Sequence, residues 1–274
     1  MKTTDTLLAC CVVGLACFIG GQSVGVHTTA TRSEAAGAIE ERNPSVSRGP
    51  GIAVDSGTLL PREFPHGEEL VVASSLLMRP ERPSISPDDT RRRLALGISG
   101  TYMNALLRSR DSALTRWPDR TTRPLRVFIR DGEDIAGWTA DYLPVVRDAF
   151  DSWVQAGIPV RFTFVVDSAS ADVHVRFISA FTNGISGKTI WSRDAGHWLV
   201  SSDIQLAVSH PGGGFVTPPQ MRAIALHEVG HLLGLDHAES SDDIMSARVR
   251  VRDLSESDRA TVRLLYAVPA GSVK

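Results

Sequence analysis

Hydrophobic and polar positions become regular near residue 122 and stay so to about residue 269. Apolar residues recur at intervals of three and four from Trp138 to Gly157, which predicts a helix that ends at the glycine. Alternating or β-rich segments predict five strands, at 124–130, 161–166, 171–178, 188–192 and 202–208. A strand, a helix and then several strands predict an α+β fold, in which a twisted mixed sheet carries the long helix on one face.

A second helix is predicted to begin after Thr217. The threonine is a good N-cap, Pro218 suits the first helical position, and Gln220 is placed to complete a capping box. Apolar residues then continue to Leu233. Gly234 is the expected end, because glycine permits the left-handed conformation that terminates helices.

The chain before residue 122 is predicted to contain three segments. Residues 1–26 include an uncharged apolar stretch, which indicates a signal peptide; an uncleaved membrane anchor or a lipid-modified cysteine are alternatives. All three place the domain outside the cytoplasm, secreted or in the cell envelope. Residues 27–90 are rich in proline and lack periodicity, so we interpret them as a low-complexity linker or pro-segment. Their apolar patch at 70–78 is a candidate docking element, and residues 91–121 form a helical lead-in.

Charge and cysteine content restrict the chemistry. The 29 basic and 31 acidic residues give a net charge of -2, so nothing favours nucleic acid or an anionic membrane surface as a partner. The three cysteines, Cys10, Cys11 and Cys17, all lie in the N-terminal apolar stretch. A metal site in the folded domain must therefore use histidines and carboxylates.

The second helix carries a pattern with metal-ligand spacing. His227 and His231 are four residues apart, so both imidazoles project from one face about one turn apart and can reach one zinc ion. Gly234 then turns the chain, and His237 is placed to return as a third ligand. Three imidazoles leave the fourth zinc position open, as a catalytic site requires. Glu228 follows the first ligand directly, where it can act as general base toward a zinc-activated water.

The segment HEVGHLLGLDH at 227–237 resembles the long zinc signature of the metzincins, and its LGLDH ending resembles the matrixin branch. The resemblance implies that Met245 lies in a tight turn as an apolar floor beneath the metal. It also implies that residues 254–266 form the C-terminal helix. On this basis we expect a matrixin-like zinc metalloprotease domain at 122–269.

Two departures from the family pattern concern latency. Matrixins of animals usually carry a pro-segment cysteine that blocks the zinc, and no cysteine follows Cys17. The acidic pair of the family's last helix corresponds to Ser257 and Asp258, so only one acid remains. We therefore expect no activation by the cysteine-switch route. The other histidines are scattered, so a second zinc site is not expected, and Ca²⁺ binding is left open because no calcium site can be located.

These observations predict a secreted or envelope zinc endopeptidase that hydrolyses protein or peptide substrates, with one catalytic Zn²⁺ and Glu228 as general base. The substrate is expected to pair as an added strand along the sheet edge at 188–192. We expect a monomer, with an N-terminal membrane tether if the first segment is not removed. The alternative is a non-catalytic, zinc-stabilised extracellular binding module, against which Glu228 argues.

Overall fold

The computed structural model of the chain describes residues 68–71, 85–210 and 212–274. The chain divides into two units, Met1–Ser56 and Gly57–Lys274, and every described residue belongs to the second. The predicted signal peptide or anchor at 1–26 and most of the predicted linker at 27–90 lie outside the described residues. Among those described, no helix is long and apolar enough to cross a membrane.

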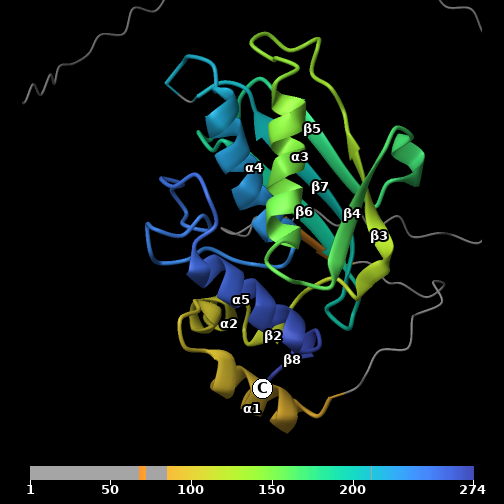
Figure 1. Cartoon of the computed structure of the whole chain (residues 1–274), viewed down its shortest axis with the longest axis vertical. Coiled ribbons are helices and arrows are strands. Elements are labelled where there is room, and N and C mark those ends of the chain that lie inside the picture. Colours follow the sequence, from red (N-terminus) through yellow and green to blue (C-terminus); the bar gives the residue numbers. More distant parts are fainter. Residues whose placement is uncertain (1–67, 72–84, 211) are drawn as a thin grey trace, which may run out of the picture. The chain divides into compact units, whose positions relative to one another are not determined.

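A six-stranded sheet has the spatial order β1-β6-β7-β5-β3-β4 (Figure 1). In chain order its strands are β1 (Glu68–Val71), β3 (Arg120–Ile129), β4 (Val160–Val165), β5 (Val173–Ile178), β6 (Gly187–Arg193) and β7 (Leu199–Ala207). Strands β3, β4, β5 and β7 are parallel, whereas β6 runs antiparallel to β7 and β1 runs parallel to β6. The predicted mixed sheet is confirmed, and its five predicted strands lie within a few residues of their expected ends.

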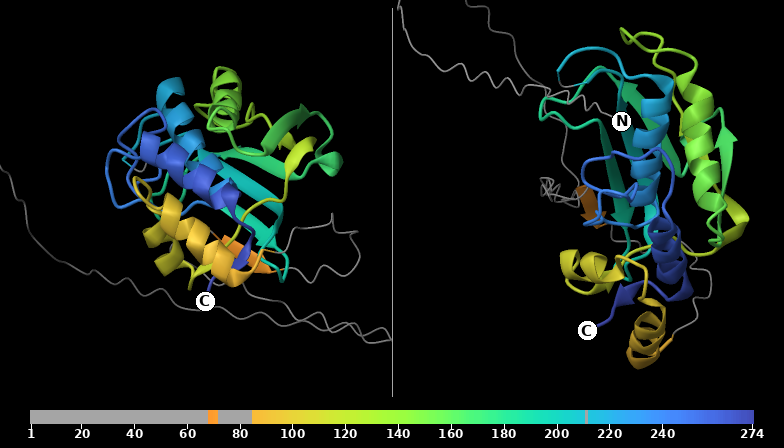
Figure 2. Two further views of the ribbon diagram at one scale, coloured as in Figure 1. Left: turned by 60° about the horizontal axis from the view of Figure 1, so that its bottom comes forward. Right: turned by 60° about the vertical axis from the view of Figure 1, so that its left-hand side comes forward.

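Two helices, α3 (Tyr142–Val154) and α4 (Pro218–Leu232), lie side by side over one face of this sheet (Figures 1 and 2). The buried face of α3 includes Phe150, whose ring packs edge-on against two phenylalanines of β4. Burying each such side chain stabilises the fold by about 1.5–3 kcal/mol. The Trp153 indole N–H donates to the Leu226 carbonyl at 2.9 Å and joins the two helices.

The ends of both helices follow from local chemistry. Helix α4 begins at Pro218, as predicted, because the Gln220 side chain accepts a hydrogen bond from the Thr217 N–H at 2.8 Å. Helix α3 begins four residues later than its pattern predicts. Gly137 adopts a positive φ of 86°, so the chain around Trp138 forms turns before the helix starts.

The predicted lead-in at 91–121 contains most of helix α1 (Pro87–Gly97), which begins four residues earlier, and all of α2 (Met103–Ser109). Both helices contact the C-terminal helix α5 (Glu256–Ala267). A short strand after them, β2 (Ala113–Leu114), pairs with β8 (Gly271–Ser272). Elsewhere, a 3-10 turn at Ser168–Ser170 lies between β4 and β5 in the chain. The lead-in contributes six fully or almost fully buried apolar side chains to the core, namely Leu94, Tyr102, Met103, Leu106, Leu114 and Trp117. It therefore shares one hydrophobic core with the sheet and α4.

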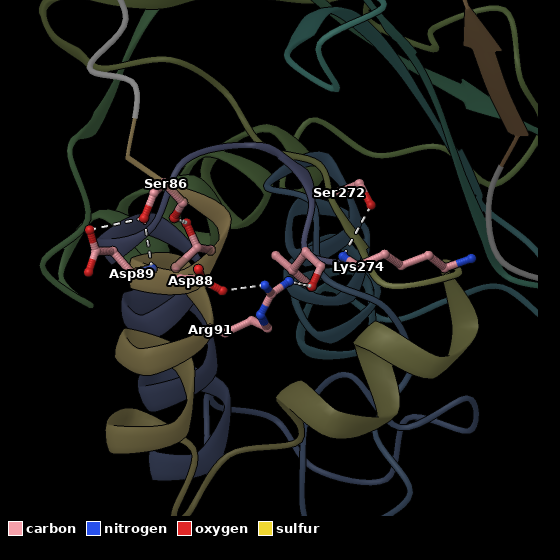
Figure 3. A network of polar contacts seen from close by, with 8 residues as sticks. Ser86, Asp88, Asp89, Arg91, Ser272 and Lys274 are labelled. Atoms are coloured by element: carbon pink, nitrogen blue, oxygen red, sulfur yellow. Dashed lines mark hydrogen bonds and ion pairs between the residues drawn. The ribbon is translucent and has the colours of Figure 1, made fainter.

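Polar contacts surround the first turn of α1 and join it to the end of the chain (Figure 3). The Ser86 hydroxyl caps α1 by accepting from the Asp89 N–H at 3.1 Å. Arg91 pairs with the Asp88 carboxylate and donates to the Val273 carbonyl at 3.0 Å. Exposed pairs of this kind contribute little free energy, but they show that the first turns of α1 lie against the last residues of the chain.

Candidate metal centre

Three histidines meet at the C-terminal end of α4. His227 and His231 project from one face of the helix, and His237 comes from the loop that follows. One ring nitrogen of each lies within 4.8 Å of the others, and the ring centroids are 4.7–5.2 Å apart. In the described part of the chain, no other group of three His, Cys, Asp or Glu side chains has metal-ligand geometry.

Gly234 makes the return of the chain toward the site possible. Its φ is 98°, a conformation that side chains rarely adopt, and a Cβ atom there would also overlap with the carbonyl oxygen of Thr115. Leu235 N–H then bonds back to the Gly230 carbonyl at 3.0 Å, which closes the helix end. The predicted turn is therefore in place, and the chain presents His237 three residues after Gly234.

The ring nitrogens of the two helical histidines are arranged for a cation. The Nδ1 atoms of His227 and His231 face the carbonyl oxygens of Ile244 and Leu235 at 2.8 Å and 3.1 Å. A carbonyl can only accept, so each Nδ1 carries the hydrogen and each Nε2 presents a lone pair. Burial lowers the pKa of both histidines below the usual value, which keeps the rings neutral.

These lone pairs face one another, since the Nε2 atoms of His227 and His231 are 3.1 Å apart. Two neutral acceptors at this distance repel, whereas a cation between them is attracted by both. Tetrahedral zinc with bonds of 2.0–2.1 Å holds its nitrogen ligands about 3.4 Å apart. The donor set and its spacing therefore fit zinc, with His237 completing a set of three.

Glu228 lies beside this cluster and is almost completely buried. Burial raises the pKa of its carboxyl to about 7, and a hydrogen bond from Thr189 acts in the opposite direction. The Thr189 hydroxyl, on β6, lies 2.6 Å from Oε2 of Glu228. The other carboxyl oxygen, Oε1, sits against Gly187, where a Cβ atom would overlap with it. Thus β6 holds one oxygen of the carboxyl group and leaves space for the other.

Met245 is fully buried in a tight turn after the histidine loop. Its carbonyl accepts from the Ala238 N–H at 2.8 Å, which ties the turn to the chain directly after His237. The buried Asp258 carboxylate accepts from the Ile244 N–H at 2.8 Å and the Met245 N–H at 3.4 Å. The same Ile244 supplies the carbonyl that orients His227, so this turn fixes one of the candidate ligands.

The structure brings together all six residues that the sequence singles out, which are His227, Glu228, His231, Gly234, His237 and Met245. Their chemical roles stay predictions. Sequence reasoning did not find Thr189 and Gly187, because nothing in an ordinary β-strand pattern marks a contact with a distant helix. Two of the other described histidines have different surroundings: His174 faces the Ser168 carbonyl and His210 faces Gln220.

Comparisons with known proteins agree with this geometry. Residues 134–267 match the family model of the matrixins. A relative, the metalloendoproteinase 1-MMP of Arabidopsis thaliana, is 30% identical over 146 residues, which cover 46% of this chain and 38% of that protein. The chain thus spans well under two thirds of that relative's length. The match covers α3, the sheet from β4 onward, α4 with the histidine cluster, and α5, so residues 134–267 of this chain form a matrixin-like metzincin domain.

Proposed function

We propose that the domain is a zinc endopeptidase that acts on protein or peptide substrates outside the cytoplasm. The observation that carries the proposal is the juxtaposition of three convergent imidazoles with a buried carboxyl group, that of Glu228, on the helix that bears two of them. A merely structural metal site has no use for a carboxyl group placed beside its ligands. The predicted kind of activity follows from these groups and from the family match.

In this proposal His227, His231 and His237 hold the metal, and Glu228 moves the proton. When bound, zinc supplies Lewis acidity, which polarises a substrate carbonyl and makes water more acidic. Glu228 takes the proton from the attacking water through Oε1, since Thr189 engages Oε2. The water oxygen bonds to the carbonyl carbon, the C–N bond breaks, and Glu228 passes the proton to the leaving nitrogen.

The edge at which we expect substrate to pair is not free. Strand β1 lies parallel to β6 there, with Glu68 opposite Ile190 and Val71 opposite Arg193. This corrects the expectation of an exposed edge at 188–192. We propose that a peptide substrate pairs with the same backbone groups of β6 and displaces β1, because an edge strand can bond only one neighbour on that side.

Cleavage of casein and of a mixed peptide library tests the proposal. Replacing Glu228 with Gln should reduce kcat about 10²- to 10⁴-fold, the usual contribution of a general base, while bound zinc stays at one ion per chain. Glu239→Gln is a matched control, because Glu239 is exposed and pairs only with Arg108 among described residues. Full activity in Glu228→Gln would refute the mechanism. If the wild type cleaves no peptide, the zinc-stabilised binding module is favoured.

The cellular setting is also a proposal, and it rests on the apolar stretch within residues 1–26. We propose an extracytoplasmic, monomeric enzyme, tethered to the membrane only where that stretch is retained. The mass of the mature protein, determined after expression in a secreting host, distinguishes a cleaved signal from an anchor or a lipidated cysteine. A mature protein that begins at Met1 and stays in the cytoplasm would contradict this location.

A further inference from the structure

The lead-in, which lies outside the family match, lines the side of the metal site where α4 ends. The Trp117 indole N–H donates to the Leu232 carbonyl at 2.9 Å, and the Thr115 carbonyl fits against the missing side chain of Gly234. These contacts reach the last turn of α4 and the glycine turn. They raise the question of whether the lead-in also acts on the ligands themselves.

Arg110, just after α2, reaches the loop that carries the third histidine. Its Nη2 donates to the Leu235 carbonyl at 3.2 Å, and its Nε lies 3.6 Å from Oδ2 of Asp236. The arginine side chain is 12% exposed and the aspartate 3%, so the ion pair is largely shielded from water. The guanidinium also lies over the Trp191 ring of β6, 5.1 Å from its centroid.

Both groups that Arg110 contacts act directly on candidate ligands. The Leu235 carbonyl is the acceptor for Nδ1 of His231, at 3.1 Å, and so fixes the ring and tautomer of that histidine. The Asp236 carboxylate accepts from the backbone N–H of His237 through Oδ1, at 2.7 Å. One guanidinium therefore contacts both the carbonyl that bonds to His231 and the carboxylate that bonds to the backbone of His237.

We propose that Arg110 is a positioning residue of the metal site, which sets His231 through the Leu235 carbonyl and His237 through Asp236. The inference deepens the proposed function and rests on it for the identity of the metal. Arginine suits the position because its planar fork can address a carbonyl and a carboxylate together and still stack on an aromatic ring. Ser109 assists by donating to the same Asp236 oxygen, Oδ2, at 2.7 Å.

The test measures zinc affinity on the full chain, by competition with a chromophoric chelator and without any substrate. Outer-shell partners of metal ligands typically contribute 10- to 100-fold to metal affinity, so Arg110→Met should weaken zinc binding by about that factor. Arg110→Lys keeps the charge but cannot bond to both acceptors, so its zinc affinity should lie between those of the wild type and Arg110→Met. Arg108→Ala is the matched control: Arg108 lies in the last turn of α2, two residues before Arg110, but bonds to exposed Glu239, so this variant should bind zinc like the wild type.

Two further readouts separate positioning from loss of folding. The visible spectrum of the cobalt-substituted protein should change in intensity or position in Arg110→Met but not in Arg108→Ala, because it reports ligand geometry. For peptide hydrolysis at saturating metal, kcat should fall while KM stays near the wild-type value. If Arg110→Met does not fold, the same comparison is made with Arg110→Lys and Asp236→Asn.

The inference is overturned if folded Arg110→Met, Arg110→Lys and Asp236→Asn all bind zinc as tightly as Arg108→Ala with an unchanged cobalt spectrum. Because neither measurement uses a substrate, failure of the proposed peptidase activity would show separately. A wild type that binds zinc but cleaves nothing, with weakened zinc binding in Arg110→Met, refutes the activity and supports the positioning role.

Discussion

The buried carboxyl group of Glu228 should make the metal-free protein less stable as the pH rises. Its folded-state pKa is about 7, against 4.5 for the exposed group. The folded form therefore binds this proton more tightly than the unfolded form, and the stability it contributes is complete below pH 4.5 and lost as the pH rises through 7. With one pKa unit worth 1.36 kcal/mol, ionisation costs the fold about 1 kcal/mol at pH 5 and about 3 kcal/mol at pH 8.

Glu228→Gln removes this cost and keeps the size of the side chain. Relative to the wild type, the metal-free variant should gain about 2 kcal/mol in the free energy of unfolding between pH 5 and pH 8. Burial lowers the pKa of His227 and His231, so these two histidines make the fold less stable as the pH falls below 6.5. Both proteins contain them, so their contribution cancels when the two free energies of unfolding are subtracted. Comparing the two proteins isolates the carboxyl group.

The assay is urea unfolding of both proteins with a chelator present, at pH 5, 6, 7 and 8, with equal m-values required in each pair. Adding zinc should shrink the pH-dependent difference, because a nearby cation favours the ionised carboxylate. Glu239→Gln, at an exposed site, should follow the wild type at every pH. Parallel curves for wild type and Glu228→Gln from pH 5 to 8 would refute the argument that this carboxyl group is desolvated.

Three predictions concern β6 and its neighbours. Gly187→Ala should push the Glu228 carboxyl aside and reduce kcat about 100-fold with zinc content unchanged; unaltered kcat would contradict the close approach. Thr189→Val removes the hydroxyl that lowers the pKa of Glu228, so the acidic limb of the kcat/KM profile should move to higher pH, and Thr189→Ser should restore it. Proline at Glu69 or Leu70 removes a β1 backbone N–H and should lower KM in peptide assays, while Leu70→Ala should not.

Much of the fold could be predicted from the sequence because its elements carry clear periods. The α3 pattern and the strand alternation each reflect one buried face, and the Thr-Pro-Pro-Gln signal at 217–220 places the start of α4 correctly. The pairings of β1 with β6 and of β2 with β8 could not be predicted. These segments have two to four residues, too few for a period, and β1 lies within a proline-rich stretch whose composition predicts a linker.

In the candidate site, too, the residues that are close in sequence could be predicted and those that are distant in sequence could not. His227, His231 and Gly234 are related by the geometry of one helix and its end, so spacing alone predicts their arrangement. The groups that support them are distant in sequence. Thr189 and Glu228 are 39 residues apart, and Arg110 and Leu235 are 125 apart, so only the tertiary fold brings them together.

The lead-in shows why such distant contacts matter for function. The division of the chain at residue 122 stays a prediction, but Leu106 and Trp117 are fully buried in the core that contains α4. Each such side chain stabilises a fold by about 1.5–3 kcal/mol when buried, whereas whole domains have only about 5–15 kcal/mol of net stability. A segment with six of these residues is therefore a structural part of the domain that carries the candidate metal site, and Arg110 lies on it. The family match covers residues 134–267, whereas Trp117, which bonds to the last turn of α4, and the other buried side chains of the lead-in come before it.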